Sequence, residues 1–228
     1  MMGASAWCSS PPSEFHVHIS FLEPKSEKII YRLHRAESIA VLEGLSLQGR
    51  IVRDDGGTMS VFVFGYGSLM WNPDFKFQDT RTALLDGWRR AWCVRSTFYR
   101  GCEKTPGLVL GLKRGGSCVG ILFEVAAEHA QATLGALDSR EMRERGYVRQ
   151  LLDVRHAGGT VQANVYTSDG LPDLDGSDFD AAYQGARGRA GPTSDYVEKT
   201  RDFIQHLGVP NHWPAANDGL PDGVSSVG

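Results

Sequence analysis

The hydrophobic pattern of this 228-residue chain becomes regular at Val61. Residues 61–64 form a short apolar run that ends at Gly65, which is typical of a buried strand. Further along the chain, apolar segments of strand length are separated by glycine-rich turns at 114–117 and 157–159. We predict that these segments are strands: 90–96, 108–113, 118–125, 148–154 and 160–167.

Two segments have helical periodicity, residues 126–143 and residues 193–207. The second has the stronger pattern, with Thr193 or Ser194 to cap its start and Gly208 to end it. The chain therefore combines many strands with few helices, and the two do not alternate regularly. This combination indicates an α+β fold or a small closed barrel.

The two ends of the chain lack this regularity. Residues 1–60 are predicted to be an N-terminal extension of unknown role, partly disordered, because a Ser- and Pro-rich start and a Gly-rich linker at 53–58 offer little to bury. Residues 61–213 are expected to form the organised domain. Residues 214–228 return to loop composition and are expected to be a C-terminal tail.

Composition narrows the class of protein. The chain has 24 basic and 27 acidic residues, a net charge of −3, which argues against a chain-wide electrostatic grip on nucleic acid or anionic lipid. We see no signal peptide and no apolar run near the ~18 residues that a membrane helix needs. The 4 cysteines include no C-x-x-C pair, so we expect a reducing compartment, the cytoplasm.

The most informative segment follows the first predicted strand. There the chain reads Gly65-Tyr-Gly-Ser-Leu69 and then Trp71-Asn-Pro73. Two glycines let a backbone turn sharply and aim several amide N–H groups at one point, which suits an anion or an oxyanion. A dinucleotide-binding fingerprint fails because its third glycine would be Met70 and because a turn stands where a helix should begin. A tight turn without a ligand is the alternative.

Glu141 lies on the apolar side of the first predicted helix. Side chains three and four residues apart share a helix face, so Leu134, Leu137 and Glu141 fall in one line. Burial disfavours the charged form of a carboxylate and makes it a stronger base, a property of catalytic glutamates. The alternative is a structural ion pair with one of three nearby arginines: Arg140, Arg145 or Arg149.

Five motifs stand in the order in which the ChaC proteins carry them: Phe64-Gly-Tyr-Gly-Ser-Leu-Met-Trp71, Arg100-Gly101 with Pro106-Gly-Leu-Val109, Cys118-Val-Gly-Ile-Leu-Phe123, Leu137-Asp-Ser-Arg-Glu-Met142 with Gly146-Tyr147, and Gly191 with Asp195-Tyr196. Each motif alone is a weak signal, but the ordered combination is specific. Over residues 61–213, the chain resembles the glutathione-specific γ-glutamylcyclotransferases of the ChaC family.

The resemblance implies an α+β fold, the γ-glutamylcyclotransferase-like small mixed β-barrel with flanking helices. It implies a carbon–nitrogen lyase that cleaves glutathione to 5-oxoproline and cysteinylglycine with no metal and no organic cofactor. The catalytic glutamate falls on Glu141, and a tyrosine of the C-terminal helix falls on Tyr196. The substrate-binding loop falls on six residues: Phe64, Gly65, Tyr66, Gly67, Ser68 and Leu69. Among the arginines of residues 89–100, we assign Arg100 to the glycine carboxylate of glutathione.

The chain departs from the family at two positions near the expected mouth of the site. Cys102 and Glu103 follow Arg100-Gly101 where the family often has Thr-Pro, and Gly191 is followed by Pro192 and Thr193 where Gly-x-Asn is frequent. Substrate preference therefore stays open between glutathione and other γ-glutamyl amino acids or γ-glutamylamines. A non-catalytic protein that binds γ-glutamyl ligands is a further alternative, although a binder has no need of a base.

Other kinds of site fit less well. No cysteine stands in a nucleophile motif. A calcium loop starting at Asp173 would need glycine where Asp178 stands and an acidic residue where Gln184 stands, so the acids at 173–180 are predicted to be solvated loop residues. The arginines and aromatic residues at 88–100 are expected to form a strand edge rather than a nucleic-acid surface. The sequence does not give the oligomeric state.

Overall fold

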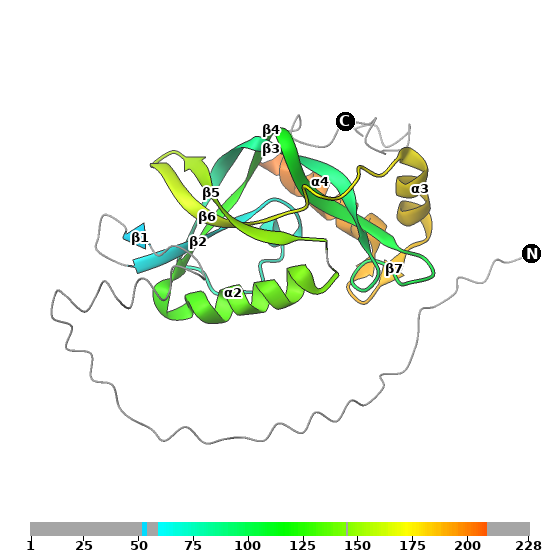
Figure 1. Cartoon of the computed structure of the whole chain (residues 1–228), viewed down its shortest axis with the longest axis horizontal. Coiled ribbons are helices and arrows are strands. Elements are labelled where there is room, and N and C mark those ends of the chain that lie inside the picture. Colours follow the sequence, from blue (N-terminus) through cyan, green and yellow to red (C-terminus); the bar gives the residue numbers. More distant parts are fainter. Residues whose placement is uncertain (1–51, 54–58, 145, 209–228) are drawn as a thin grey trace, which may run out of the picture.

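The strands form a small closed barrel. The computed structural model describes residues 52–53, 59–144 and 146–208. In this part of the chain one sheet has 6 strands in the order β1–β2–β4–β3–β5–β6, and β6 also pairs with β2 (Figure 1). That last pairing closes β2 to β6 into a barrel. The strands are β1 (Val52–Arg53), β2 (Met59–Gly65), β3 (Asp79–Ser96), β4 (Gly107–Ala126), β5 (Val148–His156) and β6 (Gly159–Thr167).

The barrel is mixed, because β2 and β6 run parallel whereas the other neighbours are antiparallel. Helix α2 runs along its outside, and α3 and α4 lie together against β4 (Figure 1). The helices are α2 (Ala127–Glu141), α3 (Gly176–Gly185) and α4 (Thr193–His206), with the 3-10 turns η1 (Ser68–Met70) and η2 (Met142–Glu144) and a ribbon of β7 (Arg187–Gly188) and β8 (Gly191–Pro192). None of the described helices is both long and apolar enough to cross a bilayer.

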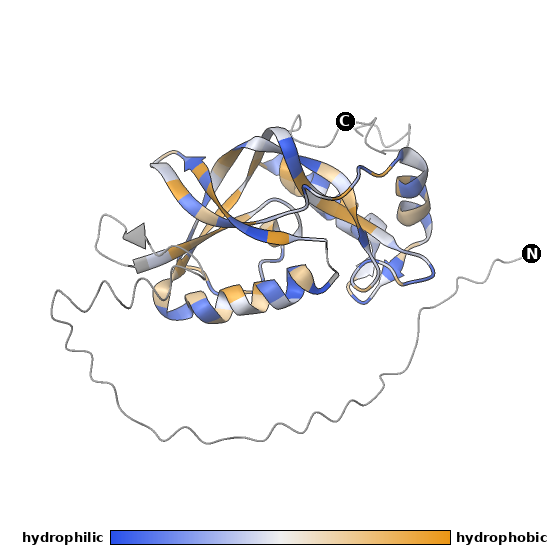
Figure 2. Ribbon diagram, viewed as in Figure 1, coloured by the Kyte–Doolittle hydropathy of each residue, from blue (hydrophilic) through white to orange (hydrophobic). Residues whose placement is uncertain are grey.

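Strand β2 is buried on both faces, which explains its continuous apolar sequence. Val61 and Val63 belong to the core between the barrel and α2, together with Leu134. Phe62 and Phe64 face the opposite way, into the barrel interior. In Figure 2 the barrel strands carry hydrophobic stretches, while hydrophobic and hydrophilic residues alternate along α2. The predicted strand at 61–64 is confirmed and extends from Met59 to Gly65.

The turn predicted at 114–117 is wrong. Strand β4 continues through it and pairs with β3 from end to end. Opposite Gly87, whose φ is 78°, stand Gly115 and Gly116 with φ of 97° and 73°, so the pairing contains a bulge. Glycine adopts positive φ without a steric penalty, and a bulge and a tight turn therefore need the same residue.

A second bulge lies nearer the end of the β3–β4 hairpin. Trp92 stands opposite Leu110 and Val94 stands opposite Val109, which leaves Cys93 as the extra residue of β3. A bulge bends a strand and changes the direction in which neighbouring side chains point. Val109 and Leu110 both line the cavity described below.

Several predicted boundaries also need correction. Residues 79–89 belong to β3, although the sequence pattern predicted a strand only from Arg90. Helix α3 occupies part of the predicted acidic loop, and Asp175 caps it by accepting a hydrogen bond from the N–H of Asp178 at 3.0 Å. Thr193 begins α4 but does not cap it, because its hydroxyl donates to the Arg100 carbonyl oxygen at 3.2 Å.

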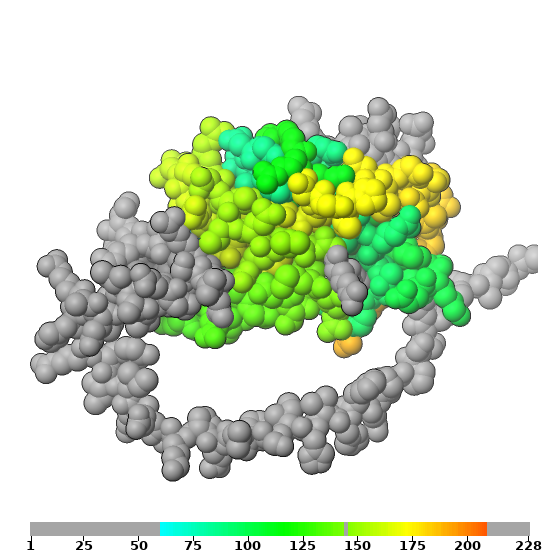
Figure 3. Space-filling model, in the orientation of Figure 1, coloured from blue at the N-terminus to red at the C-terminus, as the bar shows by residue number. Residues whose placement is uncertain are grey.

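The predictions for the two ends lie largely outside the described residues, which exclude 1–51, 54–58 and 209–228. Within the predicted linker, Arg53 belongs to β1 and stands opposite Met59. On the face drawn in Figure 3, the surface of α2 adjoins that of the β5–β6 hairpin.

We predict that Val63→Ala lowers the free energy of unfolding by about 2 kcal/mol, because it removes buried methyl groups and leaves a cavity. Val63 is 0% exposed, whereas Val148 on β5 is 62% exposed. The same substitution at Val148 should change stability by less than about 0.5 kcal/mol. Urea denaturation followed by tryptophan fluorescence measures both variants, and equal losses would contradict the burial of β2 on both faces.

Candidate active site

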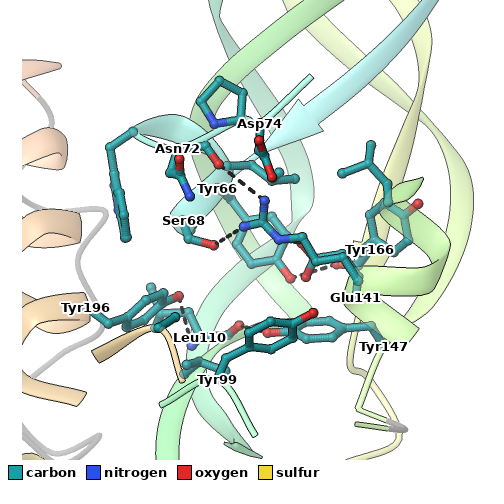
Figure 4. A pocket seen from close by; sticks show the side chains of 18 of the residues that line it. Tyr66, Ser68, Asn72, Asp74, Tyr99, Leu110, Glu141, Tyr147, Tyr166 and Tyr196 are labelled. Carbon is teal, nitrogen blue, oxygen red and sulfur yellow. Dashed lines mark hydrogen bonds and ion pairs between the residues drawn. The ribbon is translucent and has the colours of Figure 1, made fainter. Parts of the chain in front are cut away.

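A cavity of about 330 Å³ lies beside the end of β2. Its walls come from the turn after β2, the last turn of α2, the end of the β3–β4 hairpin, β6 and α4. Ligand pockets usually measure about 300–1,000 Å³, so the cavity can hold a small molecule. The polar side chains around it are Ser68, Asn72, Asp74, Tyr99, Arg100, Arg140, Glu141, Tyr147, Tyr166 and Tyr196, with Tyr66 at its base (Figure 4).

The turn after β2 is a short 3-10 turn, in which the N–H of Met70 donates to the Gly67 carbonyl oxygen at 3.0 Å. A β-carbon built at Gly67 would lie 2.8 Å from the Tyr196 hydroxyl oxygen. Glycine is therefore needed here for space rather than for an unusual φ. The absence of a side chain lets the turn approach α4 closely.

Two further side chains hold this turn in place. Arg90 is buried, and its Nε donates to the Tyr66 carbonyl oxygen at 2.7 Å. The indole Nε1 of Trp71 donates to the Thr200 hydroxyl at 3.1 Å, which ties the turn to α4. Charge-assisted and buried hydrogen bonds of this kind fix backbone positions. The turn is thus a fixed wall of the cavity.

Glu141 is the last residue of α2, and its side chain points into the cavity (Figure 4). Leu134 and Leu137 precede it on the same face and are buried, as their spacing predicts. The Glu141 side chain is 16% exposed and forms an ion pair with Arg140, Nε to Oε1, at 3.2 Å. The cavity-facing position and the arginine ion pair, which the sequence offered as alternatives, are both present. Arg149 instead pairs with Asp138 at 3.4 Å.

Four tyrosine rings surround the Glu141 carboxylate, and each hydroxyl has a defined partner. Tyr66 donates to the Tyr166 carbonyl oxygen at 2.7 Å, and Tyr147 donates to the Leu110 carbonyl oxygen at 2.6 Å. The Tyr196 hydroxyl accepts from the Leu110 N–H at 3.2 Å. One peptide residue of β4 therefore positions two tyrosines from distant parts of the chain.

The same rings show the electrostatic character of the cavity. Burial raises the pKa of Tyr66 and Tyr147 well above the usual value, and the charge of Glu141 adds to the effect. Burial also raises the pKa of Tyr196, to about 12, although its hydrogen bond from Leu110 opposes this and Glu141 adds to it. Tyr166 donates to Asp138 at 2.7 Å, and burial followed by this bond raises its pKa. All four hydroxyls thus stay protonated at neutral pH.

Arg100 supplies a buried positive charge at the other side of the cavity. Its Nη1 donates to the Pro192 carbonyl oxygen at 3.3 Å, and its guanidinium lies 5.8 Å from the ring centre of Trp71 and 5.6 Å from that of Tyr196. Burial lowers the pKa of Arg100 and Arg140 acts in the same direction, whereas Tyr196 and the carboxylate of Asp195 raise it. The hydrogen bond and the ring contacts of Arg100 are with neutral groups, so an anionic ligand would add a strong partner to a charge that is costly to bury.

The structure brings most residues of the sequence-based prediction to one cavity. Glu141 and Tyr196 lie on opposite sides of it, and these residues join them in lining it: Tyr66, Gly67, Ser68, Leu69 and Arg100 (Figure 4). Phe64 and Gly65 of the predicted loop do not line it. Phe64 is 0% exposed in the barrel core, and Gly65 is the last residue of β2. Cys102 and Glu103 are also not among the lining residues.

Sequence reasoning missed several residues of the site. The sequence offered Arg140 only as an ion-pair partner of Glu141 and gave Tyr147 and Tyr166 no role, yet all three line the cavity. Tyr166 is the next-to-last residue of the predicted strand 160–167, on the face opposite Val161, Ala163 and Val165, so the alternation did not mark it as buried. Nothing in the local sequence distinguishes Arg140 from the exposed Arg143 three residues later.

The other candidate sites stay unsupported. Arg89 and Arg95 form ion pairs with Asp173 and Asp178, at 3.1 Å and 2.7 Å, on the surface around α3. The acidic residues considered for a calcium loop and the arginines considered for a nucleic-acid surface are thus paired with each other. Among the described residues, no group of three or more His, Cys, Asp or Glu side chains is placed to hold a metal ion.

Comparisons with known proteins agree with this geometry. The family described as ChaC-like protein matches residues 61–220. A relative from Escherichia coli (strain K12), named glutathione-specific gamma-glutamylcyclotransferase, is 35% identical over 174 residues, which are 73% of this chain and 72% of the relative. A relative from Homo sapiens, named glutathione-specific gamma-glutamylcyclotransferase 1, is 37% identical over 97 residues, 42% of this chain and 44% of the relative.

A solved structure extends the likeness to the fold. The crystal structure of a gamma-glutamyl cyclotransferase specific to glutathione from yeast superposes with a TM-score of 0.58 at 18% identity. The match covers 64% of this chain and 87% of the yeast chain. The predicted α+β fold, the γ-glutamylcyclotransferase-like mixed barrel with flanking helices, is confirmed.

The buried tyrosines predict a loss of stability at alkaline pH. The pKa of Tyr196 is about 12 in the folded protein and about 10 in an unfolded chain. Its contribution is complete below pH ~10 and is lost as the pH rises toward 12, because the unfolded chain releases the proton first; it amounts to roughly 3 kcal/mol or less. Tyr196→Phe should therefore show a shallower fall in unfolding free energy between pH 10 and 12, measured by urea titration. An unchanged slope would contradict the assignment.

Proposed function

This chain belongs to the ChaC-like protein family, and we propose that it is a glutathione-specific γ-glutamylcyclotransferase that cleaves glutathione to 5-oxoproline and cysteinylglycine. We propose residues 61–213 as its catalytic domain. The observation that carries the proposal is the position of Glu141, a largely buried carboxylate that faces the turn after β2 across a cavity of about 330 Å³.

The reaction closes a ring within the substrate. The α-amine of the γ-glutamyl unit attacks the γ-carbonyl carbon of the same unit, a new C–N bond forms, and the bond to the cysteine nitrogen breaks. Both reacting groups belong to one molecule, so the enzyme has to hold it in the cyclising shape. Correct orientation of this kind can lower a barrier by about 7–11 kcal/mol. A narrow cavity with fixed walls is suited to that task.

Glu141 is the general base in this mechanism. Only the neutral amine can attack, so a carboxylate must first take a proton from the α-ammonium group. The same carboxyl group then returns that proton to the cysteine nitrogen as it leaves. The second proton of the ring nitrogen follows to the released amine, so that the products are the neutral lactam and the ammonium form of cysteinylglycine. One residue serves both steps, and no covalent nucleophile, metal or organic cofactor takes part. General acid–base catalysis of this type contributes about 10²–10⁴ in rate.

The cavity presents charges of both signs, as glutathione does. The substrate carries two carboxylates and one ammonium group, and the cavity is lined by Arg100 and Arg140 and by Asp74 and Glu141. Arg100 donates a hydrogen bond to a neutral carbonyl group and lies near two neutral rings, and we assign it to the glycine carboxylate. Glu141 receives the ammonium group. This arrangement sets the direction in which the substrate lies.

The tetrahedral intermediate carries an oxyanion, which needs donors. The backbone N–H groups of the turn from Gly65 to Leu69 can receive that oxyanion or hold the α-carboxylate. Tyr196 is a further donor. Its hydroxyl oxygen accepts a hydrogen bond from the Leu110 N–H, and among the described residues no acceptor is given for its hydroxyl proton, which can therefore be donated to a molecule in the cavity. Loss of one such donor typically lowers turnover by about 10²–10³.

We also propose that the reaction takes place in the cytoplasm. Cys93 and Cys118 are buried free thiols. Glutathione is itself a thiol, so its reduced form is available there.

We predict that Glu141→Gln lowers the rate of 5-oxoproline release from glutathione by about 10²–10⁴, because the amide cannot accept the proton. Mass spectrometry of 5-oxoproline and cysteinylglycine measures the reaction. Glu128→Gln is the matched control, since Glu128 is exposed in the first turn of the same helix. Binding without turnover in the wild-type protein, or full activity of Glu141→Gln, would refute the proposal.

Arg100 makes a second prediction possible. Glutathione and γ-glutamylcysteine differ by the glycine, so the ratio of their kcat/KM values reports the glycine carboxylate. Arg100→Gln should lower this ratio by about 10-fold or more, the usual worth of a hydrogen bond to a charged group. Arg189→Gln, an exposed arginine near the cavity rim, should leave the ratio unchanged. An equal ratio in wild type and Arg100→Gln would rule out this role.

A further inference from the structure

Arg140 has an unusual set of partners. Its Nε pairs with Glu141 Oε1 at 3.2 Å, its Nη2 donates to the Ser68 hydroxyl at 2.9 Å, and its Nη1 donates to the Asn72 carbonyl oxygen at 3.3 Å. Each nitrogen of the guanidinium thus has its own partner (dashed lines in Figure 4). Two partners lie on the turn after β2, and the third is the carboxylate that faces the cavity.

The other hydrogen bonds described above for the turn after β2 do not involve Glu141 or its helix. Arg90 holds the Tyr66 carbonyl oxygen from within the barrel, and Trp71 bonds to Thr200 of α4. These contacts fix the turn to the barrel and to α4. Arg140 belongs to α2, so among these contacts it alone connects the turn to the helix that carries Glu141.

We propose that Arg140 is a positioning residue, which holds the Glu141 carboxylate charged and at a fixed distance from the turn after β2. The inference rests on the proposed function of Glu141 as the base. A planar guanidinium that makes two hydrogen bonds and one ion pair fixes direction as well as distance, which a single ammonium group cannot do. The arginine that precedes the glutamate in the sequence is thereby part of the site.

Arg140 pairs directly with the Glu141 carboxylate, and four tyrosines face that carboxylate as well. Tyr66 at the end of β2, Tyr147 before β5, Tyr166 on β6 and Tyr196 on α4 face it with neutral rings. On its own helix, Asp138 is bonded to Tyr166 and paired with Arg149. Arg100 lies on the Tyr196 side of the cavity. Removal of the Arg140 charge would therefore favour the protonated carboxyl group.

The test follows the carboxyl carbon of Glu141 by NMR in protein labelled with ¹³C-glutamate, with the signal identified by its absence from Glu141→Gln. In Arg140→Gln, we expect the pH midpoint of this signal to rise by at least about one unit, the size of effect that an adjacent arginine has on a carboxylate. The acid side of the pH–kcat profile should move in the same direction. Arg143→Gln, which removes an exposed arginine of the adjacent turn, should leave both unchanged.

Two further variants separate charge from geometry. Arg140→Lys keeps the charge but has one nitrogen for three partners, so its midpoint should stay near that of wild type while kcat falls about 10-fold or more with little change in KM. Ser68→Ala removes one contact to the turn and should leave the midpoint unchanged. Arg140→Lys remains informative if Arg140→Gln fails to fold.

An unchanged midpoint in Arg140→Gln, or wild-type turnover in Arg140→Lys, would overturn the proposal. A rise in KM alone, with the midpoint unmoved, would mean that Arg140 only receives a substrate carboxylate, and this outcome also contradicts it. The NMR measurement needs no turnover. A protein that shows the expected midpoint shift but releases no 5-oxoproline would disprove the proposed function and leave the Arg140–Glu141 coupling intact.

Discussion

The parallel pairing of β2 with β6 is the constraint on which the rest of the structure depends. It closes five strands into a barrel and thereby buries β2 on both faces. A strand in that position has no solvent-facing side, so it can bring a functional group to the surface only where it ends. The turn that follows Gly65 lies at that point, and the cavity forms around it.

The cavity holds charged side chains in buried surroundings, where a charge is less stable than in water. Glu141, Arg100 and Arg140 lie among tyrosine rings whose own ionisation is suppressed by burial. Fixed charges in such a place act more strongly on a bound molecule than they would in water. They also have to be compensated when no ligand is present, and the ion pair between Arg140 and Glu141 does this for these two charges.

The fold class, the turn after β2 and the cavity-facing glutamate follow from sequence because each depends on a short-range pattern. The run 61–64, the glycines at 65 and 67 and the leucines before Glu141 all reveal burial through local spacing. The bulges, helix α3 and the roles of Tyr147 and Tyr166 could not be predicted from local spacing. Their roles depend on which strand lies opposite, and the same glycines at 115 and 116 suit a turn or a bulge equally well. Arg140 and Arg143 differ only in the direction each faces, which one helical turn decides.

The bulge at Cys93 has an implication for how such a barrel adapts to new ligands. It sits opposite Val109 and Leu110, and Leu110 alone orients two aromatic walls through its N–H and its carbonyl oxygen. Deleting or shifting one residue there would move both walls together while leaving every chemical group in the chain unchanged. Selectivity in this architecture can therefore diverge through single-residue insertions and deletions in a hairpin, a route that a comparison of substituted positions alone would overlook.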